Sequence, residues 1–265
     1  MKWLAIIWLF ALYFVLYGLM YTATYQTRVV LLMTVPYTWA CLLGVWLAAG
    51  SASAVIRLLG TIAVSCLLVG PIVHLDYHPT PFSVGLATAT SVSAVLTLML
   101  GSLSAMLPLR TTWQIRFALW EVVVSVTLLA FTFAWLKELS ELTEWQLEDW
   151  PDIIGGDYMA LAVFTSVLVV ATLLPVSVLG ARDRWIGWGI LLVTLAALPI
   201  LECVTFHWLY GTNFTPLFFY QHNLYQAGLS LAVLIPFTRW LPGILLRERP
   251  EPAEPDEANS PVDPT

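Results

Sequence analysis

Imidazole and carboxylate side chains are the groups of this sequence best suited to chemistry, and they stand at the edges of long apolar runs. The chain contains only four histidines, and two acidic residues lie close to them. Nitrogen and oxygen ligands of these kinds suit Zn, Fe, Cu or Mn. The sequence therefore offers one candidate set of metal ligands, which comprises His74, Asp76, His78, Glu202, His207 and His222.

The identity of a cofactor stays open at this level. Two facing imidazoles would also suit haem, and an imidazole beside a carboxylate would suit a proton-linked gate. Pro79 disfavours a helical conformation at His78, and in an extended chain His74, Asp76 and His78 would share one face. The three cysteines have no spacing typical of a metal site or of a disulfide framework.

A second group of polar residues lies inside apolar runs rather than beside them. His222, Gln226 and Ser230 recur every fourth residue, which makes one helix face too polar to face lipid. Glu121 lies roughly one to two turns into an apolar run, where an ionised carboxylate normally faces a bundle interior. Arg110 and Arg116 are possible partners of a buried interhelical ion pair, although Arg116, five residues away, is not on the same helix face. Such a pair or a carboxylate that reaches the inner interface would explain Glu121, and so would a proton or cation relay. The relay candidates are Glu121, Glu202, His222 and Gln226.

The elements that would position these residues are membrane-spanning helices. Of all residues, 59% are hydrophobic and only 11% are charged, against roughly 25% charged in soluble domains. A helix needs about 20 apolar residues to cross the hydrocarbon core of a bilayer. Such runs predict an all-α, polytopic bundle of about eight transmembrane helices, at 3–21, 29–49, 58–75, 83–107, 117–136, 158–179, 185–201 and 218–241.

Basic residues give this bundle an orientation, because Lys and Arg are retained on the cytoplasmic side of a membrane. An N-terminus inside the cell places nine basic residues in inner segments and only Arg28 and Lys137 in outer ones. We therefore expect a cell-membrane protein with both termini in the cytoplasm. All four histidines then fall on the outer side, where neutral His is tolerated and therefore needs no function.

Short matches at a near-constant offset indicate an internal repeat. The run 57–60 (RLLG) matches 184–187 (RWIG) at an offset of 127, and Pro71-Ile72 matches Pro199-Ile200 at an offset of 128. A four-span unit repeated in parallel explains these matches, although an apolar composition also produces them by chance. The predicted domains are a transmembrane domain at 1–246, with repeat halves 1–110 and 111–246, and a disordered, acidic, Pro-rich cytoplasmic tail at 247–265.

The predicted fourth span carries small residues at every fourth position. Small side chains let a neighbouring helix approach closely, which favours a packing face over a substrate path. The stripe consists of Gly85, Ala89, Ser93, Thr97, Gly101 and Ala105.

Several function classes find no support. The sequence contains no HExxH, GxSxG or P-loop signature, so we do not expect an enzyme. Its net charge of −6 gives no basic surface for binding nucleic acid. Proline-broken spans and polar positions favour a transporter or a solute- or ion-binding permease, whose partners are the lipid bilayer and a small solute or ion. The alternatives are a non-catalytic subunit or assembly factor, which would bind other membrane subunits, and a metal or haem protein.

Overall fold

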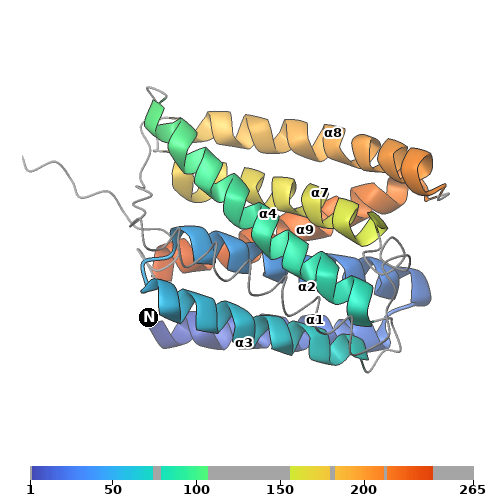
Figure 1. The fold of residues 1–265 in the computed structure, drawn as a ribbon, viewed down its shortest axis with the longest axis horizontal. Coiled ribbons are helices and arrows are strands. Elements are labelled where there is room, and N and C mark those ends of the chain that lie inside the picture. Colours follow the sequence, from blue (N-terminus) through green and yellow to red (C-terminus); the bar gives the residue numbers. More distant parts are fainter. Residues whose placement is uncertain (1, 74–78, 107–155, 180–182, 212–213, 241–265) are drawn as a thin grey trace, which may run out of the picture.

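The protein is all-helical throughout the part of the chain that the computed structural model describes, residues 2–73, 79–106, 156–179, 183–211 and 214–240 (Figure 1). This part contains seven α-helices and no β-strand. They are α1 (Lys2–Thr22), α2 (Tyr25–Ala49), α3 (Ala54–Val73), α4 (Pro79–Met106), α7 (Gly156–Leu173), α8 (Arg184–Tyr210) and α9 (Pro216–Trp240). One π-helical turn, η2 (Leu174–Val178), continues α7.

Seven of the eight predicted helices are thereby confirmed as helices, with boundaries set by recognisable end signals. Proline begins α4 and α9, where its missing N–H costs nothing. Gly211 ends α8 in the left-handed conformation (φ 62°), and its N–H donates to the carbonyl of His207. The predicted span 117–136 and the predicted tail 247–265 lie outside the described residues.

Four helical segments are long and apolar enough to cross a membrane: Thr27–Ala49, Phe82–Leu103, Gly156–Val178 and Arg184–Tyr210. The spacing of aromatic residues on α8 agrees with such a role. Trp185 is 72% exposed and Trp208 is 85% exposed, and the helix between them rises by about 35 Å. Aromatic residues flank a hydrocarbon core of about 30 Å in membrane helices, so α8 has the length and the anchors of a span.

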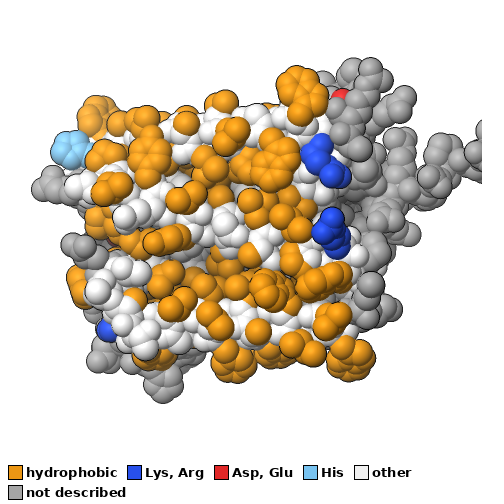
Figure 2. Space-filling model, turned by 180° about the vertical axis from the view of Figure 1, so that it is seen from behind, with side chains coloured by type: hydrophobic (Ala, Val, Ile, Leu, Met, Phe, Trp, Pro, Cys, Tyr) orange, Lys and Arg blue, Asp and Glu red, His pale blue; other side chains and the backbone are white. Residues whose placement is uncertain are grey.

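Four helices form the centre of the bundle, and the others cover it. Among α2, α4, α7 and α9, helices α2 and α7 each contact the other three (Figure 1). Around them, α8 lies against α7 and α9, α3 against α2 and α4, and α1 against α2 and α9. The outward faces of α1, α3 and α8 expose large apolar side chains such as Phe14, Leu59 and Val193. Figure 2 shows apolar side chains over the middle of one face. This is the surface expected of a bundle surrounded by lipid.

The two ends of the bundle differ in charge. Arg57 lies in the first turn of α3, Arg184 is the first residue of α8, and Arg239 lies in the last turn of α9. The guanidinium of Arg57 donates to the carbonyl of Leu47 near the end of α2 (2.6 Å), which joins these helix termini. We call this end the basic end. The far end carries Arg28, which donates to the carbonyl of Tyr21 (3.2 Å).

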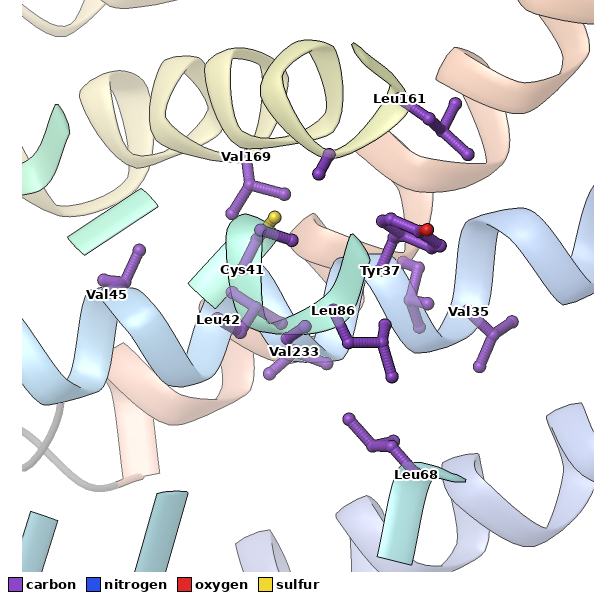
Figure 3. Packing of buried hydrophobic residues seen from close by; sticks show 14 of the residues in the cluster. Val35, Tyr37, Cys41, Leu42, Val45, Leu68, Leu86, Leu161, Val169 and Val233 are labelled. Atoms are coloured by element: carbon purple, nitrogen blue, oxygen red, sulfur yellow. The ribbon is translucent and has the colours of Figure 1, made fainter. Parts of the chain in front are cut away.

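The small-residue stripe on α4 is confirmed as a packing face. Gly85, Ala89, Ser93, Thr97 and Gly101 are all buried, because α4 crosses between α2 and α7. Close approach lets hydroxyl groups reach backbone carbonyls of the next helix: Ser93 donates to Cys41 (3.0 Å) and Ser166 of α7 donates to Ala89 (3.1 Å). Figure 3 shows Cys41, Val45 and Val169 in this apolar core.

Candidate functional site

The predicted site residues divide into three groups. His74, Asp76, His78 and Glu121 lie outside the described residues. His207 is exposed in the last turn of α8. Glu202, His222 and Gln226, by contrast, are completely buried in the far half of the bundle.

Helix α9 carries three of its polar residues on its buried side. His222, Gln226 and Ser230 are inaccessible to solvent, as the stripe predicted, whereas Leu224 and Tyr225 on the opposite side are exposed. A helix in water would place these side chains the other way round. This arrangement is typical of a membrane helix, whose polar groups avoid lipid by facing the bundle interior.

His222 faces α2 through its Nδ1 atom. The hydroxyl of Thr34 lies 2.9 Å from His222 Nδ1 and donates its own hydrogen to the carbonyl of Val30 (2.7 Å). If the Thr34 hydroxyl donates its single hydrogen to Val30, it accepts one from the imidazole, and in that tautomer Nδ1 carries the proton while Nε2 presents a lone pair. Nε2 has no hydrogen-bond partner in the described part of the chain.

Glu202 faces α9 through its neighbour Asn223. The amide nitrogen of Asn223 donates to Glu202 Oε2 at 2.6 Å, and both side chains are buried. Glu202 lies about 12 Å along α8 from its end at Tyr210, so the carboxyl group is well inside the helix bundle. The second oxygen, Oε1, has no hydrogen-bond partner among the described residues.

Gln226 reaches the third neighbouring helix. Its amide nitrogen donates to the backbone carbonyl of Thr165 on α7 at 2.7 Å. His222, Asn223 and Gln226 thus contact α2, α8 and α7 in turn, from little more than one turn of α9. One short segment therefore joins polar groups of three helices.

The bonds just described leave a set of buried polar atoms without hydrogen-bond partners in the described structure. We call the side chains that carry them, together with Thr34, the buried polar cluster. Leaving such an atom unsatisfied costs roughly 1–3 kcal/mol, and more for a charged group. The cluster is therefore suited to receiving a ligand, an ion or water. The unpaired atoms are Thr165 Oγ1, Glu202 Oε1, His222 Nε2, Asn223 Oδ1, Gln226 Oε1 and Ser230 Oγ.

Charge is the distinctive property of this cluster. No charged side chain in the described ranges lies close enough to compensate Glu202, and no group of three or more His, Cys, Asp or Glu among these residues could hold a metal ion. A buried carboxylate without a partner is neutralised by binding either a proton or a cation. Glu202 therefore has the chemistry to take up a proton or a cation.

Thr34, Thr165 and Asn223 belong to the cluster but were not predicted as site residues. Asn223 adjoins His222, and its amide in an apolar run was a signal that sequence alone could have used. Thr34 and Thr165 gave no comparable signal. Threonine is common in membrane helices, where its hydroxyl usually bonds to its own helix, as that of Thr38 does to the carbonyl of Thr34 (2.7 Å).

Comparison with known proteins returned no match to a protein-family model, to a curated protein or to a solved structure. The chemistry of the buried polar cluster is therefore the basis on which a function can be proposed.

Proposed function

We propose that this chain is a multi-pass membrane transporter or solute- or ion-binding permease, and that its substrate path runs through the buried polar cluster. The observation that carries the proposal is the fully buried Glu202, which has one oxygen bonded to Asn223 and the other unpaired among the described residues. Apolar side chains would pack this interior at lower cost. A function that requires polar groups inside the bundle explains why they are there.

The positions of the helix ends support an eight-span topology. In the parallel helices α4 and α7, the early residues Gly85 and Tyr158 lie side by side. Helix α4 therefore ends at the basic end with Met106, while α7 begins at the far end with Gly156. A span at 117–136 would connect these two ends. The chain would then cross a cell membrane eight times, with both termini in the cytoplasm.

The pattern of helix neighbours supports the tandem repeat. The sequence offsets match α2, α3 and α4 with α7, α8 and α9. Under this correspondence the contacts between these helices come in pairs: α2 with α3 and α7 with α8, α2 with α4 and α7 with α9, α2 with α9 and α7 with α4. This is the pattern that a pseudo-two-fold axis would give. The cluster then lies where the halves meet, as in transporters built from repeats.

Water access tests the proposal. In a background with Cys41, Cys66 and Cys203 replaced by Ala, Ser230→Cys would place a thiol in the cluster with little change in volume. We expect a membrane-impermeant methanethiosulfonate to label this thiol from either side, in right-side-out and in inside-out vesicles, because a transporter opens its path to both sides. Ala227→Cys is the matched control, because Ala227 is buried one turn away in the apolar core between α7 and α8. Labelling from one side only, or no faster than in the control, contradicts a transport path.

A metal or haem protein is the second candidate, and His222 Nε2 favours it. This buried nitrogen has no partner in the described residues, and a neutral imidazole nitrogen is a common metal ligand. An absorption spectrum and a metal analysis of the purified protein test this candidate. A Soret band or a stoichiometric transition metal would support it over a transporter, and the absence of both would contradict it.

A further inference from the structure

We infer that the buried polar cluster binds a singly charged cation through the oxygen atoms of Glu202, Asn223, Gln226 and Thr165. This inference deepens the proposed function, on which it rests, by naming the class of ion that the path would take. Three properties of the cluster support it: the orientation of the side-chain amides, the charge and the number of acceptors.

The orientation of both amides is fixed by their partners. Asn223 directs its nitrogen to a carboxylate oxygen and Gln226 directs its nitrogen to a backbone carbonyl. A backbone carbonyl has no hydrogen to donate, and neither has the ionised form of Glu202, so with an ionised Glu202 exchanging N and O in either amide would place two acceptors against each other. The unpaired atoms Asn223 Oδ1 and Gln226 Oε1 are therefore oxygens with free lone pairs. Together with Glu202 Oε1 they form a set of acceptors, which a donor or a cation satisfies and an anion does not.

The charge of the cluster selects a single positive charge. Glu202 is the only acidic side chain in the cluster, and the other groups are neutral amides, hydroxyls and one imidazole. One positive charge neutralises the carboxylate, whereas a divalent ion would leave a net charge of +1 in a low-dielectric interior, which is costly. Calcium sites accordingly gather several carboxylates, and this cluster has one.

The number of acceptors favours a cation over a proton. A proton on Glu202 would make Oε1 a single O–H donor, which could satisfy only one of the two amide oxygens of Asn223 and Gln226. A cation that has lost its water accepts several oxygen ligands at once, and Thr165 Oγ1 and Ser230 Oγ add hydroxyl oxygens to the cluster. Carbonyl oxygens and carboxylates likewise replace water around Na⁺ or K⁺ in membrane channels and transporters.

Positions along α9 keep these acceptors together. Asn223 and Gln226 are three residues apart, so their side chains are neighbours on one helix face at roughly 5–6 Å between Cβ atoms. Each amide is in turn tied to another helix, Asn223 to Glu202 of α8 and Gln226 to Thr165 of α7. The acceptors thus come from three helices within about one turn of α9, which is compatible with a single ion.

Thermal unfolding of the purified full-length protein in lipid nanodiscs tests the inference, with tryptophan fluorescence as the readout. The salts are the chlorides of Na⁺, Li⁺, K⁺, ammonium and methylammonium, compared with choline chloride at equal ionic strength, and the chlorides of Ca²⁺ and Mg²⁺. We expect at least one of the five singly charged ions to raise the melting temperature with a saturable dependence on concentration, because a ligand that binds only the folded state stabilises it. The salts that raise the melting temperature show whether the site prefers an alkali ion or an ammonium group.

Two variants localise the effect. Glu202→Gln should abolish the cation-dependent shift, and Gln226→Met, which keeps the carboxylate, should raise the half-saturating concentration by roughly tenfold. Thr97→Val is the control, because Thr97 is buried in α4 and bonds to its own helix, and it should keep the full shift. If Glu202→Gln does not fold, the half-saturating cation concentrations of Gln226→Met and Thr97→Val are compared instead. A higher value in Gln226→Met alone supports the inference.

Three outcomes would overturn the inference: no singly charged ion acts beyond choline, a divalent ion acts more strongly than all of them, or the shift survives unchanged in the folded variants. The test is independent of the labelling of Ser230→Cys. Labelling from both sides without any cation effect would support the transport proposal and contradict the cation-binding inference. A cation effect without labelling would support cation binding and contradict the transport path.

Discussion

Helix α2 approaches helix α4 at Gly44 without an intervening side chain, and adding one methyl group there tests the packing directly. A Cβ atom at Gly44 would collide with the hydroxyl of Ser93 and with the backbone carbonyl of Thr90. The hydroxyl could rotate away, but the carbonyl belongs to the backbone of α4 and could move only with the helix. The variant Gly44→Ala therefore forces the two helices apart, and overpacking of this kind costs about 1–3 kcal/mol.

A matched substitution separates this clash from the general preference of helices for alanine. A Cβ atom added at Gly228, inside α9, would meet nothing within 4 Å, so Gly228→Ala should stabilise the protein by up to about 1 kcal/mol through helix propensity alone. The same gain applies at Gly44. The difference in stability between the two variants, about 1–3 kcal/mol, then isolates the clash.

Unfolding in mixed micelles of increasing SDS content, followed by tryptophan fluorescence, would measure both variants against the wild type. We expect Gly228→Ala to be the more stable variant, and Gly44→Ala to weaken the α2–α4 interface without a change in helix content. Equal stability of the two variants, or a more stable Gly44→Ala, would refute the close approach of α2 and α4.

The same contacts between helices support three further predictions. Asn223→Leu removes the donor to Glu202 and should lower the free energy of unfolding by about 1–3 kcal/mol. This loss should be smaller in a Glu202→Gln background. An equal loss in both backgrounds would show that the two side chains are not coupled. Ser93→Leu should destabilise the protein by more than Leu100→Ile, because the stripe on α4 admits only small side chains; equal melting temperatures would contradict this. Cysteines at Ser51 and Asp183 should be labelled from the side opposite to cysteines at Thr24 and Thr215, and labelling of all four from one side would contradict the alternating topology.

The sequence was enough to predict the helical class, because long uncharged runs have few other solutions in a bilayer. Backbone groups in lipid must bond within their own segment, so such a run predicts a helix, and the described runs are helical. Thus 158–179 and 185–201 already indicated α7 and α8. The stripe from Gly85 to Gly101 likewise indicated a packing face, since small residues at every fourth position lie on one side of a helix and gain only from a close neighbour.

The location of the candidate site was only partly accessible from sequence. Periodicity placed His222, Gln226 and Ser230 on one helix face, because that spacing is local. It could not show that Glu202, 21 residues earlier in the chain, bonds to Asn223, since the pairing depends on how α8 and α9 rotate against each other.

Only the tertiary structure decided which polar groups are left without partners. Thr34 and Thr165 belong to helices far away in sequence, and their roles arise because α2 and α7 flank α9. Hydropathy identifies each apolar helix, but it hardly predicts which side of the helix faces the bundle when lipid and protein interior are equally apolar. The polar contacts between helices fix that rotation here, and they set the positions of the free oxygens around Glu202.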